Sequence, residues 1–394
     1  MTILHRVRLQ NVRNQESLAL AFEPGVNVLA GPNGVGKTSV LEAVHTGLRG
    51  WSPRTRSLRE MIHRGSSVMR VELELETPSG FVVAATGYDR EGLRRTTRAG
   101  APVEGYERWE EEFPVRVFLP DHLLMVKGGP RRRRRWVDEL AAALRPAHRA
   151  VAGEYENALR QRNTLLRRGI VGAEHRVWEA VLAGRGLELV QSRRETLAAF
   201  SPRYAAAFRM LAGSSECGRE GDRAEASAHE SRPEAEGEAR LVYRTNVAEL
   251  AGEAYRDRLA EERGDDRRRG YTRLGPHRDD VRFFLGERDL REYGSQGEQR
   301  TALLAVLLAE REWIHEKMGV WPLLLLDDVM SELDADRRGA LLEVLRRGGQ
   351  SIITTTTTEY FPSAELGRLN LVRLEFGSSE VHGSRAEGGV DLDG

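Results

Sequence analysis

The stretch Gly31-Pro32-Asn33-Gly34-Val35-Gly36-Lys37-Thr38 decides the fold of this chain. It fits the pattern G-x-x-x-x-G-K-[ST], which needs a buried strand before it and a helix after it. Residues 26–30 read as such a strand, and residues 39–44 open a helix with apolar residues at helical spacing. Backbone N–H groups of the turn and the positive end of the helix suit phosphate oxygens. We therefore expect nucleotide binding by Gly31, Pro32, Asn33, Gly34, Val35, Gly36, Lys37 and Thr38.

The last two residues of this loop have distinct chemical roles. Lys37 would reach the β- and γ-phosphates, and the Thr38 hydroxyl would ligate Mg²⁺, so ATP and Mg²⁺ are the expected cofactors. The chain has 60 basic residues, of which only those at 37, 127 and 317 are lysines. A compact ammonium at position 37, where a guanidinium would be bulkier and planar, fits the phosphate-binding role.

Composition limits the other possibilities. At 394 residues the chain can bury a real core and is expected to form two lobes. Its formal net charge of zero predicts no partner, so any polyanion site must come from local clusters of arginine. The single Cys217 excludes an internal disulfide framework. The first residues resemble a strand, and no apolar run is long enough to cross a membrane. We expect a cytoplasmic protein with no membrane partner.

Strand-like segments at both ends of the chain enclose a helical middle. Apolar alternation or short apolar runs predict strands at 68–75, 81–85, 115–119, 281–285, 323–326 and 351–355. Helical spacing predicts a long helix from residue 298 and another at 336–347.

We expect residues 1–129 and 271–376 to form one α/β ATPase head, with an inserted helical lobe at 130–270. Within that lobe, residues 213–238 have almost no large apolar side chain, and residues 377–394 have a similar composition. Such segments cannot offset their ordering entropy, so both are expected to be disordered.

A second nucleotide motif is the apolar run 323–326 that ends in Asp327 and Asp328. A buried strand of this kind places a carboxylate beside the phosphate loop, where Asp327 can hold Mg²⁺ through water. Asp328 can orient the attacking water or accept its proton. Lys37, Asp327 and Asp328 are therefore predicted catalytic residues, and Thr38 and Asp327 the predicted metal ligands.

A third motif, Tyr293-Gly294-Ser295-Gln296-Gly297-Glu298-Gln299-Arg300, precedes the long helix. It resembles the Ser-Gly-Gly-Gln signature of ATP-binding-cassette ATPases. In that class the signature contacts the γ-phosphate held by a partner protomer, which implies nucleotide contacts for Ser295, Gly297 and Gln299, with Ser295 also catalytic. The alternative is an ordinary capping box between Ser295 and Glu298.

Residues 331–334 (SELD) follow at the spacing of the D-loop of that class, and Thr355 stands where transporter ATPases usually have histidine. Thr355 is therefore a predicted switch residue, able to sense a γ-phosphate but not to act as a comparable base. No Q-loop glutamine is obvious, and residues 120–122 (PDH) occupy roughly that region. Both departures favour slow hydrolysis and a switch-like use of ATP.

Taken together, the motifs resemble those of the RecF family, in the SMC-type branch of this class. The matching segments are 31–38, 54–55, 120–121, 126–130, 133–134, 161–163, 275–280, 294–301, 325–334 and the threonine run at 354. They cover nearly the whole chain except 212–240 and the tail. Where the family has Phe-Arg-Asn-Tyr, this chain has Val12-Arg13-Asn14-Gln15, which removes two aromatic side chains.

The resemblance implies an ATP-dependent homodimer that binds single-stranded and duplex DNA at gaps and junctions. It also implies work with RecR and RecO in loading RecA, within DNA replication, repair and the response to DNA damage (the SOS response), and a weak DNA-stimulated ATPase activity. Two alternatives stay open: another SMC-type head that acts as a chromosome scaffold, and the ATPase subunit of a transporter.

Clusters of arginine are the candidate DNA contacts. Residues 131–135 are five consecutive arginines, and Arg54 and Arg56 lie in a loop after the first helix. We predict DNA contacts for Arg54, Arg56, Arg131, Arg132, Arg133 and Arg134, against the alternative of solvated charge. Residues 267–269 (RRR) are expected to be solvated. His277 is either an interface or nucleotide-sensing residue or a structural histidine. Each phosphate neutralised would steepen the log–log salt dependence by about 0.9.

Overall fold

The computed structural model describes residues 2–77, 80–103, 112–170, 172–213, 237–247, 251–378, 380–381 and 384–385. These residues form two compact units: one from the described parts of Met1–His122, Met210–Ser227 and Leu307–Gly394, and one from those of Leu123–Arg209 and Ala228–Val306. The expected disordered segments, 213–238 and 377–394, lie mostly outside the described residues.

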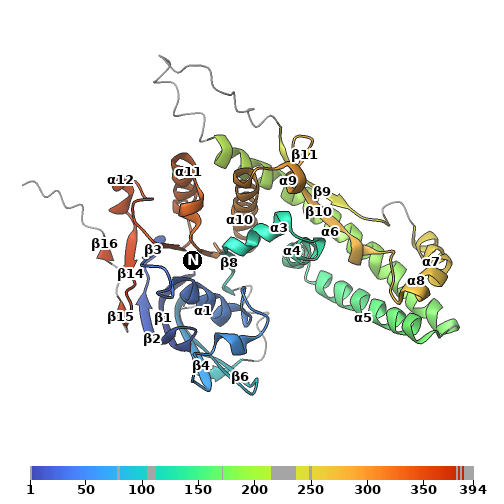
Figure 1. The fold of residues 1–394 in the computed structure, drawn as a ribbon, viewed down its shortest axis with the longest axis horizontal. Helices are drawn as coiled ribbons and strands as arrows, with labels where there is room; N and C mark the ends of the chain where they lie inside the picture. The colour runs from blue at the N-terminus through green and yellow to red at the C-terminus, as the bar shows by residue number, and fades with distance from the viewer. Residues whose placement is uncertain are drawn as a thin grey trace, which may run out of the picture. The chain divides into compact units, whose positions relative to one another are not determined.

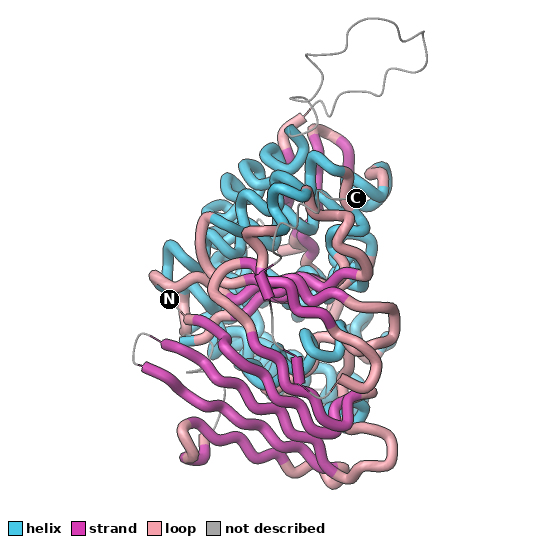
Figure 2. Tube along the Cα trace, turned by 90° about the vertical axis from the view of Figure 1, so that its left-hand side faces the viewer, coloured by secondary structure: helices cyan, strands magenta, loops and turns pink. Residues whose placement is uncertain are grey.

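The first unit contains two sheets (Figures 1 and 2). The first sheet has the order β15-β2-β1-β4-β5-β6-β7 and is antiparallel except where β15 meets β2. Its strands are β1 (Ile3–Val12), β2 (Gln15–Ala21), β4 (Val68–Thr77), β5 (Gly80–Asp89), β6 (Arg94–Arg98), β7 (Ala101–Pro102) and β15 (Glu380–Val381).

The second sheet has the order β16-β14-β3-β13-β12-β8, and all its pairings are parallel except that of β16. Its strands are β3 (Val26–Ala30), β8 (Val115–Phe118), β12 (Leu323–Leu326), β13 (Ser351–Thr355), β14 (Asn370–Arg373) and β16 (Ser384–Arg385). Strands from both ends of the chain therefore alternate in one sheet.

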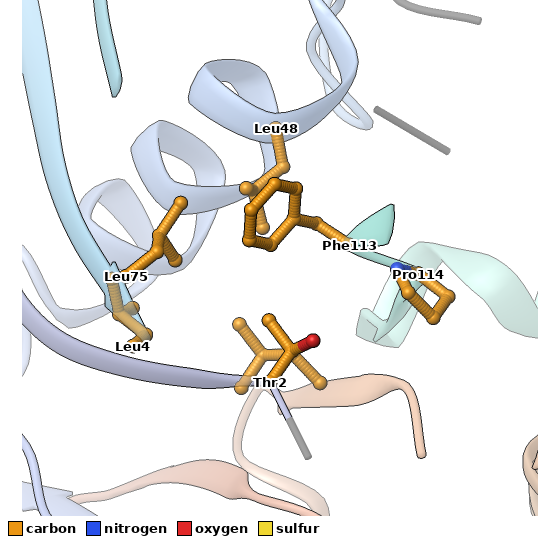
Figure 3. A pocket seen from close by; sticks show the side chains of 7 residues that line it. Thr2, Leu4, Leu48, Leu75, Phe113 and Pro114 are labelled. Atoms are coloured by element: carbon orange, nitrogen blue, oxygen red, sulfur yellow. The ribbon is translucent and has the colours of Figure 1, made fainter. Parts of the chain in front are cut away.

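Helix α1 (Lys37–Arg49) packs between the two sheets. Its apolar side chains, such as Val40 and Leu41, join one core with the inward side chains of β4, such as Val71, and with Leu325 of β12. Alternating burial along β4 is what its alternating sequence predicts. Figure 3 shows side chains, among them Leu48 and Phe113, that line a small void in this core. The volume of this void is only about 10 Å³, which is near the lower limit for one water molecule.

The remaining elements of the first unit are short helices and α11. They are η1 (Leu58–Met61), η2 (Pro120–Leu123), η4 (Val329–Glu332), α11 (Ala335–Arg346) and α12 (Ser363–Leu366). The strands expected at 68–75, 81–85, 115–119, 323–326 and 351–355 and the helix expected at 336–347 are present, with small differences at their ends.

The second unit combines helices with a small antiparallel sheet, β11-β10-β9. Its elements are α3 (Leu124–Lys127), α4 (Pro130–Leu144), α5 (Ala147–Arg168), α6 (Ala173–Gly213, with Pro202 inside), β9 (Ala239–Arg244), α7 (Gly252–Glu261), α8 (Arg263–Arg269), η3 (Pro276–Arg278), β10 (Asp280–Leu285), β11 (Arg288–Asp289) and α9 (Leu290–Tyr293). The division between the units falls inside α6 and inside α10 (Gln296–Met318).

This division differs from the expected boundaries most of all at residues 271–306, and also at 123–129 and at 210–213. Residues 271–306 were expected in the ATPase head, but they belong to the second unit. The physical reason is pairing: β10, a correctly predicted strand, lies between β9 and β11 of the small sheet. A strand pattern in the sequence shows that a strand forms but does not identify its partners.

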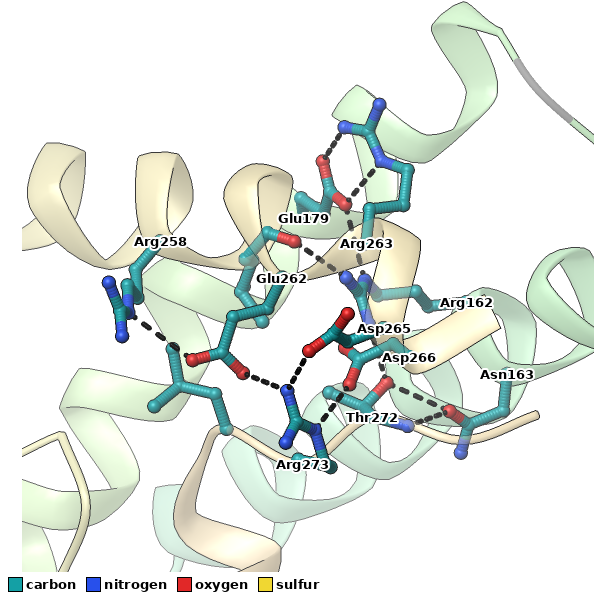
Figure 4. Close-up of polar contacts among 12 residues, drawn as sticks. Arg162, Asn163, Glu179, Arg258, Glu262, Arg263, Asp265, Asp266, Thr272 and Arg273 are labelled. Carbon is teal, nitrogen blue, oxygen red and sulfur yellow. Dashed lines mark hydrogen bonds and ion pairs between the residues drawn. The ribbon is translucent and has the colours of Figure 1, made fainter. Parts of the chain in front are cut away.

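A buried arginine holds the second unit together (Figure 4). The Arg162 guanidinium is fully buried and donates to Asp266 at 2.7 Å, to Glu179 at 3.2 Å and to the Leu259 carbonyl at 2.7 Å. It also donates to the Thr272 hydroxyl at 2.9 Å. Both acids are themselves buried, so positive and negative charges are matched inside the unit.

Candidate nucleotide-binding site

Strand order builds the site. β13 lies between β3 and β12 and runs parallel to both, so the carboxyl ends of the three strands meet at one edge of the sheet. The phosphate loop follows β3, and Asp327 follows β12. In open parallel sheets this edge is where ligands bind. The sequence predicted the two motifs, and the sheet topology brings them together.

Two glycines explain the shape of the loop. Gly36 has φ 112°, in the left-handed region, and a Cβ there would lie 2.2 Å from the Gln15 side-chain amide. At Gly31 a Cβ would lie 2.3 Å from the Leu374 carbonyl oxygen. Helix α1 then begins at Lys37, with no side chain capping its N-terminus and no acidic residue in its first turn. Its first N–H groups therefore suit an anion.

The hairpin between β1 and β2 supports the loop from behind. The Asn14 side chain donates to the Gly34 carbonyl at 2.9 Å, and the Gln15 side chain donates to the Val35 carbonyl at 2.6 Å. Asn14 matches the Phe-Arg-Asn-Tyr pattern of the resembling family, whereas Gln15 stands where that pattern has tyrosine. No local pattern in the sequence predicts this role for Gln15, because it depends on the hairpin lying beside the phosphate loop in the fold.

Lys37 lies within the loop. Its ammonium donates to the carbonyls of Gly31 at 2.6 Å and Pro32 at 2.9 Å. Burial lowers the pKa of Lys37, and the nearby carboxylates of Asp328 and Asp327 oppose that effect. The ammonium is thus held at the position from which the G-x-x-x-x-G-K pattern contacts phosphate.

The predicted metal ligands are adjacent. The Thr38 hydroxyl lies 2.9 and 3.0 Å from the two oxygens of Asp327. Asp327 is 7% exposed, and burial raises its pKa. A hydroxyl beside a carboxylate is a set of hard oxygen donors that suits Mg²⁺, which takes one or two protein ligands together with phosphate and water. Within the described residues no group of three or more His, Cys, Asp and Glu side chains forms a metal site.

Thr354 positions both acids, a role that no local pattern in the sequence predicts. Its hydroxyl donates to Asp327 at 2.7 Å and accepts the Asp328 N–H at 2.9 Å. Asp328 has a left-handed backbone, φ 49°, and its buried Oδ1 has no hydrogen-bond partner among the described residues. A buried carboxylate oxygen without a protein partner suits the predicted role on an attacking water.

Thr355, the predicted switch residue, is buried at the end of β13, and its hydroxyl donates to the Thr357 carbonyl at 2.7 Å. The residues in the region of the Q-loop form η2, where Asp121 is exposed. Ser331, in the expected D-loop, donates to the Asp328 carbonyl at 2.8 Å.

The signature turn lies in the second unit at the start of α10. Ser295 is exposed, and its hydroxyl accepts the Glu298 N–H at 3.2 Å, while Glu298 accepts the Ser295 N–H at 2.7 Å. The capping box is therefore present. Gly297 is half-buried, whereas Gln299 is 3% exposed and donates to the Leu290 carbonyl at 2.6 Å. Gln299 supports the turn from inside its own chain.

The predicted DNA contacts separate into exposed and buried arginines. Arg56, Arg131 and Arg132 are exposed, and Arg54 is exposed although it pairs with Glu42 at 3.2 Å. The predicted DNA contact of Arg133 is wrong, because this side chain is only 1% exposed. Its donors are used on Asp280 and on the carbonyls of residues 125, 126 and 128.

Arg134, next in the run, is partly buried and donates to the Asp279 carbonyl at 2.8 Å. Residues 267–269 are exposed, as expected of solvated charge.

His277 has a structural environment. Its Nδ1 accepts from the Tyr155 hydroxyl at 2.7 Å, and its Nε2 donates to the Thr272 carbonyl at 2.9 Å. Burial is the main reason that its pKa falls to about 4. Both ring nitrogens are used inside the second unit, which supports the structural alternative.

The loop, the lysine and the strand-end acids define a P-loop ATPase with the fold of an ATP-binding-cassette head. A model of the AAA domain matches residues 6–97. The DNA replication and repair protein RecF of Heliobacterium modesticaldum is 34% identical over 379 residues, which covers 95% of this chain and 98% of that protein. The chain belongs to the RecF family.

Solved structures agree with this assignment. The recombination mediator protein RecF with ATP, of the RecFOR pathway, matches with a TM-score of 0.80 at 25% identity, over 97% of this chain and 98% of that chain. The Smc head domain from Pyrococcus furiosus, with an extended coiled coil and bound to the C-terminal domain of ScpA, matches with a TM-score of 0.58 at 16% identity, over 98% and 97%. This second likeness concerns the fold alone.

Among the described helices, none is long and apolar enough to cross a membrane.

Proposed function

We propose that this chain is an ATP-dependent DNA-binding protein of recombinational repair, in which ATP closes a homodimer on DNA and slow hydrolysis releases it. The observation that carries the proposal is the joined set of Lys37, Thr38 and Asp327 at the strand ends, which has the arrangement for a nucleotide and its Mg²⁺. Family membership supports the DNA and the repair context, because the relatives named above are replication, repair and recombination-mediator proteins.

The homodimer rests on the signature turn. Because the Ser295 oxygen accepts the Glu298 N–H, the hydroxyl proton is left to be donated, and the side chain is exposed. We assign that proton to the γ-phosphate held by a second copy, with the Gly297 N–H beside it. Two nucleotides then stabilise the dimer by binding it and not the monomer. Gln299 acts by holding the turn.

Slow turnover rests on the groups around the acids. Asp328 orients or deprotonates the attacking water, and Thr355 stands where a histidine would assist it. Thr38 and Asp327 would hold Mg²⁺, which would neutralise charge at the phosphates. The proposal includes three further properties. DNA stimulates the hydrolysis rate, gaps and junctions are the preferred DNA, and the protein works with RecR and RecO.

Light scattering with Mg²⁺, ATP and a gapped duplex tests the dimer. Ser295→Ala and Glu298→Ala both break the capping box, so they form a matched pair. We expect Ser295→Ala to remove ATP-dependent dimerisation and Glu298→Ala to leave it in place. Ser295→Arg should have a stronger effect than Ser295→Ala. Binding of ATP to the monomer should stay intact in all three variants. Equal effects of the two alanine variants would assign Ser295 to the helix cap alone. Zero turnover in the presence of DNA, with intact dimers, would favour the chromosome-scaffold function.

A further inference from the structure

A pocket of about 540 Å³ lies in the first unit, outside the phosphate loop. Its walls come from the loop after α1 and from β5 and β6. Volumes of roughly 300–1,000 Å³ are typical of small-ligand pockets. Nothing in the nucleotide chemistry described above uses this pocket.

The lining chemistry selects the ligand class. Trp51 and Tyr88 supply aromatic rings, Arg56 and Arg94 supply positive charge, and Ser52 and neighbouring hydroxyl residues complete the wall. None of the described residues that line the pocket is acidic. Aromatic faces beside guanidinium groups suit a planar base attached to a phosphate.

Trp51 is held in place before any ligand arrives. Helix α1 ends at Gly50, which has a left-handed backbone, φ 74°. The His45 Nδ1–H donates to the Trp51 carbonyl at 3.1 Å, and the two rings meet edge to face at 4.5 Å between centroids. Trp51 is nevertheless 41% exposed. A fixed, exposed indole binds a base with little loss of side-chain entropy.

The two arginines differ in how they are held. Arg94 donates to the Gly50 carbonyl at 3.2 Å, which places its guanidinium at the end of α1. Arg56 is exposed and makes no hydrogen bond or ion pair with any described residue. One fixed and one free guanidinium can bind successive oxygens of a phosphodiester backbone.

The pocket wall is anchored to the helix of the phosphate loop. Glu42 is fully buried in α1 and accepts from the Ser52 hydroxyl at 2.5 Å, from Arg54 at 3.2 Å and from Arg13 at 2.7 and 3.0 Å. The Ser52 oxygen in turn accepts the N–H groups of Arg54 and Thr55, each at 3.1 Å. The basic loop is therefore an ordered wall.

We propose that this pocket binds one unpaired nucleotide of a DNA strand, with its base against Trp51 and Tyr88 and its phosphates on Arg56 and Arg94. This inference rests on the proposed DNA binding and adds a preference for single-stranded segments. A base stacked inside a duplex cannot reach the pocket unless it is extruded, whereas an unpaired base can. Sequence specificity is not expected, because every base has a stacking face.

The test is fluorescence anisotropy of the full chain with Mg²⁺ and ATP, using labelled dT20 and a labelled blunt duplex. We expect Trp51→Ala to weaken dT20 binding by about tenfold, and Arg56→Ala to weaken it less. Duplex affinity should change by no more than about twofold. Arg95→Ala is the matched control, because Arg95 is exposed and adjacent strand residues point to opposite faces, so it should not alter the preference.

Equal loss on both DNAs, or no loss on either, would overturn the assignment of the pocket. Binding of free dTMP as tightly as dT20 would assign it to a mononucleotide and overturn it as well. Cross-linking wild-type protein to an oligonucleotide containing 5-iodouracil keeps the test valid if a variant misfolds: cross-links at Trp51 or Tyr88 are expected, and cross-links only elsewhere contradict it. Failure of wild-type protein to bind either DNA would instead defeat the proposed function.

Discussion

Arg162 in the second unit and Asp327 in the first are both buried charges, but their surroundings differ. Arg162 is balanced by Asp266 and Glu179, and its guanidinium donates to protein atoms throughout. Asp327 is raised in pKa by burial and has hydroxyls as its hydrogen-bond donors. A charge balanced inside the protein stabilises the fold, whereas a charge left in excess is suited to a ligand. Burial alone does not distinguish the two.

Replacing Arg162 should produce the largest effect on stability. Arg162→Met removes the buried cation from beside two buried carboxylates, although Glu179 keeps Arg263 and Asp266 keeps Arg273. Loss of one partner from a buried ion pair typically costs about 3–5 kcal/mol. We expect thermal or denaturant unfolding to show this loss. The folded fraction of the Arg162→Met variant should bind ATP with the affinity of the wild type, as measured by equilibrium binding. A stable Arg162→Met variant with weakened ATP binding would show that Arg162 serves the nucleotide site and not the fold.

Replacing Lys37 should weaken ATP binding and leave stability almost unchanged, which is the opposite of the effect expected for Arg162→Met. Lys37→Ala removes charge-assisted hydrogen bonds to phosphate, each worth about 1.5–3 kcal/mol, so ATP affinity should fall by about 10- to 150-fold. The melting temperature without nucleotide should stay within about 2 °C of wild type, because the ammonium donates to the Gly31 and Pro32 carbonyls and not to a carboxylate. Lys127→Ala, the removal of another of the three lysines, controls for loss of positive charge.

The Thr354 hydroxyl tests whether the hydrogen-bond donors around Asp327 set its suitability for Mg²⁺. Thr354→Val removes a donor to Asp327 and an acceptor for the Asp328 N–H, and so should raise the pKa of Asp327 further. We expect the Mg²⁺ concentration for half-maximal ATP binding to rise about tenfold, equivalent to about 1.4 kcal/mol. The acid limb of its pH profile should also move to higher pH.

Thr354→Ser should restore both properties. Thr355→Val is the matched control, because the Thr355 hydroxyl bonds to Thr357 and not to the acids. It should slow hydrolysis while leaving the Mg²⁺ requirement unchanged. If both valine variants shift the Mg²⁺ requirement equally, Thr354 has no special role in placing the acids.

The smallest expected effect is the pH dependence of the second unit. The pKa of His277 falls to about 4 in the folded chain, below its usual value of about 6.5. The neutral ring therefore favours folding above pH 6.5, and this contribution is lost as the pH falls toward 4. We expect unfolding free energy to drop by about 1 kcal/mol between pH 7.5 and 5.5 through this group. Comparison with His277→Gln over the same range should show a flatter profile.

Much of this picture could be predicted from the sequence. The phosphate loop, the strand ending at Asp327 and the long helix after Ser295 all carry local patterns, and the structure has each of them. Thr354 could not be assigned, because its role depends on β13 lying between β3 and β12. The role of Gln15 has no local pattern for a similar reason, since its partner Val35 lies twenty residues further along the chain, in the loop that follows β3 of the other sheet.

The arginine run shows the limit most clearly. Five consecutive arginines predict one positive surface, but helical geometry turns each side chain by about 100° from the last. Arg133 consequently faces inward and donates hydrogen bonds to Asp280 and to backbone carbonyls. Arg131 and Arg132 remain exposed. Composition cannot separate these fates, because the inward-facing position is defined by what packs against the helix.

The placement of β3 has a consequence for synthesis of the protein. This strand is flanked by β14 and β13, both encoded near the end of the chain. While the ribosome is still translating the middle of the message, neither β13 nor β14 has been synthesised. The apolar residues of β3 therefore cannot yet pack against their neighbours, which lie more than three hundred positions further along the chain. Nascent chains should therefore acquire nucleotide affinity only after residue 373 has left the exit tunnel, and prematurely terminated products should be protease-sensitive and inert toward ATP.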